Sequence, residues 1–332
     1  MDTFFTFPAD RQRLLFEEGQ QRLGLVPASI EKDFWVCLTL RELFNLPVWG
    51  EQLTFKGGTS LSKGWQLISR FSEDIDVVIN REFLDFGGEN LSNNRLKKLL
   101  KECSRRILDE LQPALARRLN EVIPASMTWE LTPADITEDP DQQTLLFKYP
   151  SLFSNSITYL RPVVKIELGA RSDVDPVESP IIRPYLGEAF PELLRDSSFA
   201  IRTVAARRTF WEKAMLLHEE TFRPLEKTRR VRLSRHYYDL WCLITKGVAA
   251  EAMVDKDLFD HCASHRQLFF KQGWVDYSTL RKGSMRLIPL PEQLDEWRKD
   301  FAAMHEEMFF DDPPKFDEII AVVHQFETEC NR

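Results

Sequence analysis

Residues 53–60 read LTFKGGTS, and residues 72–79 read SEDIDVVI. The first stretch is a short β-rich run that ends in two glycines, which let the backbone turn tightly and approach a ligand closely. The second is a β-rich run in which Asp74 and Asp76 stand two residues apart. On a strand these two side chains project from the same face, while Ile75 and Val77 point to the core. Together the stretches predict a sheet that carries a ligand site.

The residue types in this site point to phosphate chemistry. Two adjacent carboxylates on one face repel each other, and a bound divalent cation is the usual compensation. A helix that begins near Thr59 would aim its free N–H groups at the same turn, where they suit a phosphate. A phosphate-binding turn opposite paired carboxylates is what nucleotidyl transfer requires. A solvent-facing edge strand is the alternative interpretation of the pair.

A third carboxylate would complete such a site, and Glu167 is the candidate. Residues 163–168 read VVKIEL, in which the even-numbered positions are apolar. Lys165 and Glu167 therefore share the opposite face of the predicted strand. The alternative for Glu167 is an ion pair with Lys165 or another neighbour.

The chain around this core predicts an α+β fold, because hydrophobic periodicity changes from helical to mixed and back to helical. Three parts follow: an N-terminal helical segment 1–50, a core 51–205 and a C-terminal helical domain 206–332. The predicted helices cover 10–24, 29–44, 59–70, 96–122 (one helix or two, interrupted near Pro113), 208–220, 235–244, 257–271, 294–309 and 316–327. The predicted strands cover 53–55, 74–79, 127–131, 145–149, 163–168 and 199–204.

Composition places the chain among ordinary soluble proteins. Its 332 residues are 43% hydrophobic and 29% charged, which excludes a disordered chain or a collagen-like repeat. The sequence has no apolar run near the ~20 residues that a membrane span needs. Its five cysteines are scattered and form no CxxC pair, so we expect free thiols and a cytoplasmic location. His261, Cys262 and His265 are interpreted as a surface helix rather than a zinc site.

The net charge of −8 is unevenly distributed. Residues 292–332 hold twelve acids against four bases, whereas residues 202–235 hold ten bases against four acids. We place the acidic segment away from any RNA path or against a partner; the alternative is that it covers the basic stretch. The densest basic cluster could follow an RNA backbone, or it could be a solvated helix face. That cluster is Lys227, Arg229, Arg230, Arg232 and Arg235.

Five runs in sequence order resemble the AbiEii/AbiGii nucleotidyltransferase toxin family. They are EKDFW at 31–35, KGGTSL at 56–61, RFSEDID at 70–76, RTFWEK at 208–213 and RHYYDL at 235–240. The resemblance spans roughly residues 29–244. It implies a polymerase-β-like nucleotidyltransferase core with N-terminal helices and a C-terminal helical domain.

The resemblance also implies a function. The family's members are toxins of bacterial toxin–antitoxin or phage-defence pairs, each opposed by a separately encoded antitoxin. The implied reaction transfers a nucleotide from a nucleoside triphosphate to RNA, with tRNA as the first expectation and Mg²⁺ (or Mn²⁺) as the cofactor. By position, the resemblance implies Gly58, Thr59, Ser60 and Lys213 for the nucleotide, Asp74 and Asp76 for the metal and catalysis, and Lys213 and Asp239 as further catalytic residues. The sequence stretches themselves add Gly57 and Ser72 as candidates for the nucleotide and Glu167 as a candidate for the metal and catalysis.

Other interpretations stay open at this point. Lys213 lies within an amphipathic helix, so a surface lysine that extends along its apolar stem is the alternative. Asp239 stands four residues after Arg235 and could form an ordinary pair with it. The same fold could modify a protein hydroxyl instead of RNA, or bind nucleotide or a partner without turnover.

Overall fold

The computed structural model describes residues 1–88, 92–153, 161–309 and 312–332 and separates into two compact units. The first unit comprises residues 1–64 and 72–203, and the second comprises residues 65–71 and 204–332. The short segment 65–71 therefore belongs to the second unit, although it lies in sequence between the two stretches that define the core. The three-part division at residues 50 and 205 stays a prediction.

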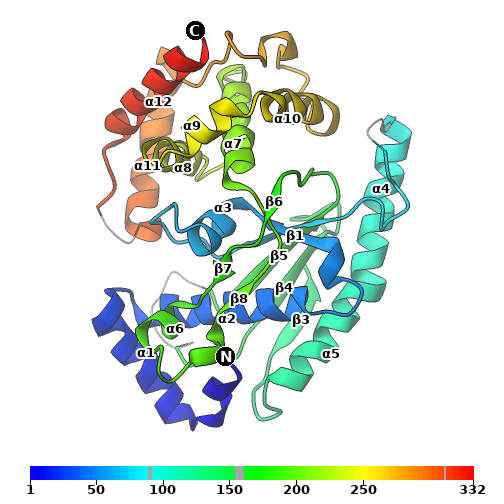
Figure 1. Ribbon diagram of the computed structural model, residues 1–332, viewed down its shortest axis with the longest axis vertical. Helices are drawn as coiled ribbons and strands as arrows, with labels where there is room; N and C mark the ends of the chain where they lie inside the picture. The colour runs from blue at the N-terminus through cyan, green and yellow to red at the C-terminus, as the bar shows by residue number, and fades with distance from the viewer. Residues whose placement is uncertain (89–91, 154–160, 310–311) are drawn as a thin grey trace. The chain divides into compact units, whose positions relative to one another are not determined.

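The first unit is built on a seven-stranded sheet with the order β3-β4-β5-β2-β1-β9-β6 (Figure 1). β1 pairs antiparallel with β2, β2 pairs parallel with β5, and β5 pairs antiparallel with β4. This mixed sheet with flanking helices confirms the expected α+β class. The strands are β1 (Leu53–Lys56), β2 (Ile75–Ile79), β3 (Glu130–Pro133), β4 (Thr144–Lys148), β5 (Val163–Gly169), β6 (Val177–Glu178), β7 (Ile181–Ile182), β8 (Phe199–Ala200) and β9 (Thr203–Val204).

The register of the central strands brings charged residues into one row. Lys56 on β1 stands opposite Asp76 on β2, and Asp76 stands opposite Glu167 on β5. Side chains at directly opposite positions lie on the same face of a sheet. β5 alternates buried and half-buried residues along its length, as the sequence predicts, so Lys165 and Glu167 share that face.

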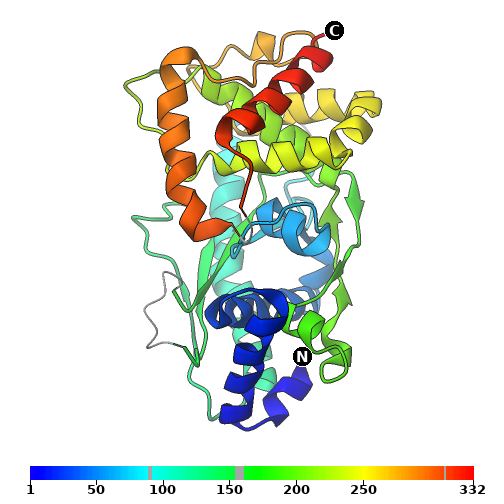
Figure 2. The same ribbon diagram turned by 90° about the vertical axis from the view of Figure 1, so that its left-hand side faces the viewer.

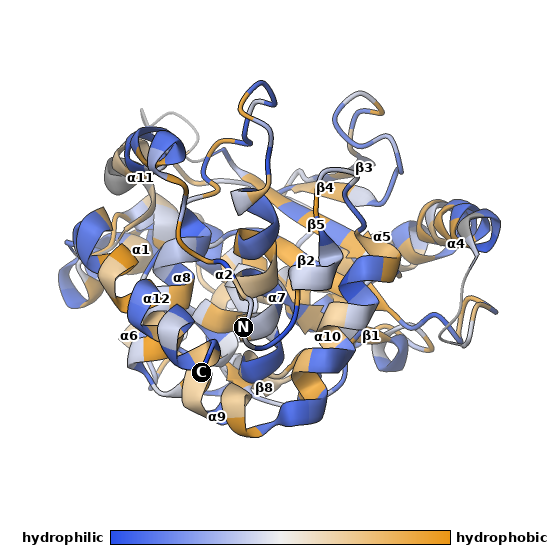
Figure 3. Ribbon diagram, turned by 90° about the horizontal axis from the view of Figure 1, so that it is seen from above, coloured by the Kyte–Doolittle hydropathy of each residue, from blue (hydrophilic) through white to orange (hydrophobic). Residues whose placement is uncertain are grey.

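The helices of the first unit cover the sheet with apolar surface. α2 packs against β5, and its Trp35 ring stacks on Tyr149 at 5.5 Å between ring centroids. In Figure 3 the strands labelled β4 and β5 are mostly hydrophobic, which fits a sheet with one face packed against helices. The helices are α1 (Ala9–Leu23), α2 (Pro27–Phe44), α3 (Gly57–Thr59), α4 (Asn93–Arg106), α5 (Gln112–Val122) and α6 (Tyr185–Ala189).

The second unit is helical and has its own aromatic core. Trp211 is fully buried, and its ring lies 4.8 Å from that of Phe259 and 6.1 Å from that of Phe326. Figure 2 shows α11 in orange and α12 in red within this unit. The helices are α7 (Ala206–Thr221), α8 (Arg235–Thr245), α9 (Val248–Val254), α10 (Lys256–Phe269), α11 (Leu294–Met308) and α12 (Phe316–Cys330). No helix in the described ranges has the length and apolar character that crossing a bilayer requires.

The helix predicted over 59–70 is wrong. The helical turn begins earlier, at Gly57, continues as a π-helical turn over Ser60–Gly64 and then ends. Gln66 has a φ of 53°, a left-handed conformation that a helix cannot contain. The short turn also removes the argument that a long helix aims its dipole at a phosphate.

Other boundaries differ less. The prediction over 96–122 is confirmed as α4 and α5 joined by a π-helical turn, Ile107–Leu111. Pro113 follows this π-helical turn as the second residue of α5, and because proline has no N–H it interrupts the α-helical hydrogen-bond pattern there. β3 lies later than predicted, and the strand expected over 199–204 is divided into β8 and β9.

Candidate active site

The carboxylate of Asp76 lies directly against the glycine turn. Gly57 has a φ of 82°, and a Cβ on this residue would come within 2.1 Å of Asp76 Oδ2. Both observations require glycine, because any side chain would be strained in the left-handed region and would collide with the carboxylate. The sequence prediction that the glycine turn and the paired carboxylates lie close together therefore agrees with the geometry.

Thr59 and Ser60 shape this turn from inside. Thr59 Oγ1 donates to the Asp74 carbonyl oxygen at 2.5 Å and lies 2.8 Å from Ser72 Oγ. Ser60 Oγ donates to the Gly57 carbonyl oxygen at 2.8 Å. Both residues are fully buried, and their hydroxyl groups bond within the turn, so the contact of these residues with a nucleotide stays a prediction. The backbone of Gly57 and Gly58 remains the candidate contact for a phosphate.

Around Asp76 the sheet face holds three carboxylates and two lysines. Burial and the neighbouring Glu167 raise the pKa of Asp76 to about 7, although Lys56 acts in the opposite direction. Lys56, which the sequence analysis did not select, also donates from Nζ to Ser172 Oγ at 2.8 Å. Lys165 forms an ion pair with Glu167, which is the alternative interpretation of that glutamate.

The carboxylates of this face differ in how well they suit a metal ion. Within the described parts of the chain, no group of three or more His, Cys, Asp or Glu side chains is arranged to hold one. Glu167 therefore does not complete a three-carboxylate centre in this conformation. Asp74 and Asp76 do fit a cation, because Asp74 and Glu167 both raise the pKa of Asp76 and a cation would relieve this repulsion.

Glu73, between the serine and the first aspartate of this stretch, ties it to α2. Lys32 Nζ lies 2.5 Å from Glu73 Oε2 and also donates to the Arg161 carbonyl oxygen at 3.0 Å. Lys32 is only 3% exposed, so the pair anchors the segment that leads into β2. This contact gives the EKDFW run a structural role beside the carboxylates.

In the second unit, Lys213 and Asp239 meet in a buried network. Lys213 Nζ lies 2.8 Å from Asp239 Oδ2. Arg70 binds the same carboxylate through two nitrogens, Nε at 2.7 Å and Nη2 at 2.8 Å. His236 Nδ1 lies 3.4 Å from Lys213 Nζ. The partner of Asp239 is thus Arg70 rather than Arg235, and Lys213 is buried rather than on the surface.

The pKa of the carboxylate in this network is shifted in the opposite direction from that of Asp76 on the sheet face. Burial alone would raise the pKa of Asp239, but Arg70 and Lys213 hold it well below its usual range. Burial lowers the pKa of Lys213, and the neighbouring Arg70 adds to this effect. Two cations against one carboxylate leave a buried excess of positive charge, which suits an anionic ligand.

The basic cluster is only partly on the surface. Lys227 and Arg230 are exposed, and Arg232 and Arg235 are half-buried. Arg229 is 8% exposed and forms ion pairs with Glu220 and Glu296, so its assignment as an RNA contact is wrong. Glu296 belongs to α11, so part of the acidic segment packs against the basic stretch, and the placement of this segment away from an RNA path stays a prediction.

Comparison with known proteins decides the family. The family model for the nucleotidyltransferase AbiEii toxin of type IV toxin–antitoxin systems matches residues 39–322. The chain belongs to this family. The resemblance noted in the five sequence runs is thereby confirmed, and nucleotidyltransferase chemistry and a toxin–antitoxin context come with it. No curated protein sequence matches the chain significantly.

Solved structures of two proteins are similar to this AbiEii-family chain. One is JHP933 from Helicobacter pylori, with 14% identity and a TM-score of 0.41, covering 91% of this chain and 90% of that one. The other is MenT4, a nucleotidyltransferase toxin from Mycobacterium tuberculosis, with 16% identity and a TM-score of 0.40, covering 96% of this chain and 98% of that one.

Proposed function

We propose that this AbiEii-family chain transfers a nucleotide from a nucleoside triphosphate to an RNA acceptor, with tRNA as the first candidate, and requires Mg²⁺ or Mn²⁺. The observation that carries the proposal is the Asp76 carboxylate packed against the backbone of Gly57, beside Asp74. A carboxylate pair and a glycine turn in contact supply a cation site and a close approach for phosphate oxygens.

Asp74 and Asp76 are the proposed metal ligands. A divalent cation bound there would offset the charge of the triphosphate and activate the acceptor hydroxyl. The raised pKa of Asp76 supports this role, because burial and neighbouring carboxylates disfavour its negative charge until a cation neutralises it.

The remaining roles belong to groups of this chain. The acceptor oxygen forms a bond to the α-phosphorus, and the bond from that phosphorus to the leaving pyrophosphate breaks with its electron pair on pyrophosphate. Glu167, opposite Asp76 in register, is the proposed acceptor of the hydroxyl proton. The backbone of Gly57 and Gly58 would orient the phosphates, and Lys213 is the proposed cationic contact for the triphosphate.

Acceptor binding and cellular context complete the proposal. The exposed Lys227 and Arg230, with the half-buried Arg232 and Arg235, are the proposed contacts to RNA phosphates. Membership of a type IV toxin family supports an antitoxin encoded separately and action in the cytoplasm.

The test is to incubate the protein with each α-labelled nucleoside triphosphate, total RNA and Mg²⁺, and to find where the label goes. Label in RNA that disappears with EDTA and in the Asp76→Asn variant supports the proposal. Label in protein would replace RNA by a protein hydroxyl as the acceptor. Absence of label with all four triphosphates, in the presence of intact RNA, would leave a binding module without turnover and overturn the proposal.

A further inference from the structure

Residues 222–234 form a loop between two helices of the second unit. It links α7, which carries Lys213, to α8, which carries Asp239. The loop exposes Lys227 and Arg230 to solvent, together with two apolar residues, Leu225 at 69% and Val231 at 83% exposure. A loop this exposed needs anchors if it is to present these side chains in a fixed arrangement.

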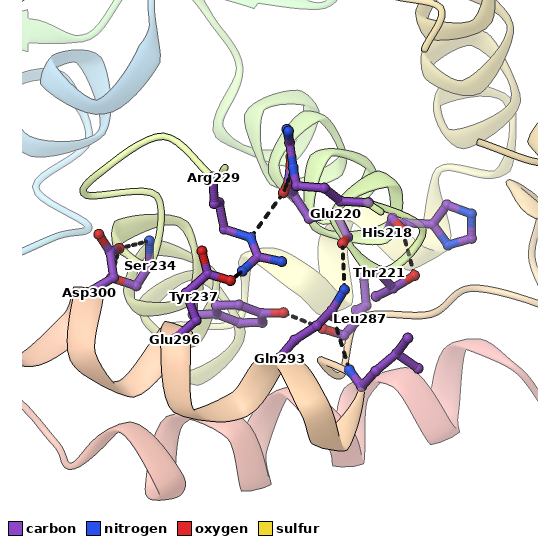
Figure 4. A network of polar contacts seen from close by, with 12 residues as sticks. His218, Glu220, Thr221, Arg229, Ser234, Tyr237, Leu287, Gln293, Glu296 and Asp300 are labelled. Atoms are coloured by element: carbon purple, nitrogen blue, oxygen red, sulfur yellow. Dashed lines mark hydrogen bonds and ion pairs between the residues drawn. The ribbon is translucent and has the colours of Figure 1, made fainter. Parts of the chain in front are cut away.

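The first anchor is the buried Arg229. Its Nε lies 3.2 Å from Glu220 Oε2 on α7, and its Nη1 pairs with Glu296 on α11. The guanidinium also lies over the Trp297 ring, 4.3 Å from the centroid. Figure 4 shows Arg229 pointing between the two glutamates. The middle of the basic loop is thus fixed to an acidic helix.

The second anchor is Asp300, also on α11. Its Oδ1 accepts from the Arg232 backbone N–H at 2.5 Å, and its Oδ2 accepts from Ser234 N at 2.8 Å and Ser234 Oγ at 2.5 Å. Arg232 has a φ of 62°, a left-handed conformation that is unfavourable for an L-residue with a side chain. Asp300 therefore holds the loop in a strained conformation, directly before α8 begins.

One exposed cation is also oriented by an aromatic ring. Lys227 Nζ lies 4.1 Å from the centroid of the Trp274 ring, a distance at which the ring attracts the ammonium group. This contact limits the motion of the lysine and leaves it exposed. It favours a preformed position for the positive charge.

We infer that the loop 222–234 is a contact surface for an RNA phosphate backbone, and that Asp300 and Glu296 of α11 are positioning residues that hold it in shape. The inference rests on the proposed function, which supplies RNA as the acceptor. Two exposed cations on a fixed loop complement a polyanion, and their spacing is set by the anchors.

This interpretation differs from a helix that imitates nucleic acid and blocks the loop. A mimic would place its carboxylates over the exposed cations. Here Glu296 binds the buried Arg229, Asp300 binds backbone N–H groups and a buried serine, and Lys227 and Arg230 stay exposed. The carboxylates of α11 therefore bind the buried side of the loop 222–234 and leave its two exposed cations uncovered.

The experiment compares two variants that remove one negative charge from the same helix. Asp300→Asn disrupts the second anchor. Asp295→Asn removes an exposed carboxylate whose Oδ1 lies 3.2 Å from Nη1 of the exposed Arg298 and which does not bind the loop in any contact described above. With unfractionated tRNA as the probe, we expect Asp300→Asn to weaken binding about tenfold, because a loop that is no longer held by Asp300 must be ordered when RNA binds. Asp295→Asn should bind as wild type or slightly more tightly. Tighter binding by both variants would overturn the inference and establish the mimic.

Two further measurements separate a positioning role from loss of folding. Hydrogen exchange in Asp300→Asn should accelerate in residues 222–234 while α7 and α12 stay protected, and binding of nucleoside triphosphate should not change. If Asp300→Asn fails to fold, Ser234→Ala removes one hydrogen bond to Asp300 and should weaken tRNA binding to a smaller extent.

The exposed cations provide the decisive control. Lys227→Ala and Arg230→Ala should each reduce the slope of log affinity against log salt by about 0.7–0.9. An unchanged slope, with wild-type protein that binds tRNA, overturns the inference and points to a protein partner at Leu225 and Val231. Wild-type protein that binds no tRNA instead overturns the RNA acceptor of the proposed function.

Discussion

The sheet face of the first unit and the buried network of the second each contain a central carboxylate. The pKa of this carboxylate is raised in the sheet face and lowered in the network. Burial, together with the neighbouring Glu167 and Asp74, raises the pKa of Asp76 to about 7. Asp239 is held by Arg70 and Lys213, and its pKa falls well below the usual range. At the first carboxylate, burial and negative charge outweigh the effect of Lys56, whereas two cations surround the second carboxylate.

This difference separates residues that await a ligand from residues that maintain the fold. A carboxylate with too little positive charge near it gains from a cation, so its contribution to an empty protein is small or unfavourable. A carboxylate between two buried cations compensates both of them, so its removal leaves charges without a partner. The predictions below test this contrast.

The largest effect is expected for catalysis in Asp76→Asn. Transfer should fall by a factor of about 10³ or more, because the variant loses a metal-facing carboxylate without losing apolar packing. Single-turnover transfer of labelled nucleotide measures the loss, and circular dichroism checks the fold. A variant with wild-type turnover would remove Asp76 from the site.

Asp239→Asn should act on stability instead. The change leaves Arg70 and Lys213 buried with incomplete compensation, and we expect the free energy of unfolding to fall by about 3–5 kcal/mol. Urea unfolding monitored by tryptophan fluorescence measures it, with Asp76→Asn as the matched control that keeps wild-type stability or exceeds it. Equal stability of Asp239→Asn and wild type would contradict the contrast.

Lys213 tests whether the surplus charge serves a ligand. Lys213→Ala should lower kcat/KM for the nucleoside triphosphate by an amount equivalent to about 2–4 kcal/mol if the ammonium contacts the triphosphate. Lys213→Arg should recover little, since a planar guanidinium does not replace a compact ammonium in a fitted site. Wild-type kinetics in both variants would assign Lys213 to structure alone.

The smallest effect concerns pH and metal. The pKa of Asp76 rises from 3.8 to about 7 on folding, so the folded chain holds this proton more tightly than the unfolded chain. Without metal, wild type should match Asp76→Asn below pH 4 and lose stability relative to it as the pH rises from about 4 to about 7, because over this range the folded carboxyl keeps its proton and the unfolded one does not. Thermal unfolding in EDTA from pH 4 to 8 measures this difference. Added Mg²⁺ should remove it at pH 8, and a difference of opposite sign would refute the assignment.

Local patterns explain why much of the fold and half of the site were predictable. The alternation in 163–168 places Lys165 and Glu167 on one face of a strand, and the two-residue spacing of Asp74 and Asp76 places those two side chains on one face. Both depend on the period of a single strand, which the sequence displays directly. Helical spacing identified α7 and α8 for the same reason.

Contacts between distant segments were not predictable. Arg70 and Asp239 are 169 residues apart, and no local period relates them. Arg229 was counted as a surface charge because a basic run is usually solvated, whereas Glu220 and Glu296 compensate it in the interior. The helix predicted over 59–70 ends before Gln66, which has a left-handed backbone conformation. Glutamine as a residue type does not indicate this conformation.

The close contact at Gly57 has a genetic consequence. Every missense change in a glycine codon adds a side chain, and here the first added carbon would meet Asp76 Oδ2 at 2.1 Å. Gly24 shares the left-handed backbone, but no described atom lies within 4 Å of the carbon it would gain. A cell that must survive this toxin can therefore escape through any missense mutation at codon 57. Among survivors of a selection, we expect such mutations to collect at codon 57 and to be rare at codon 24.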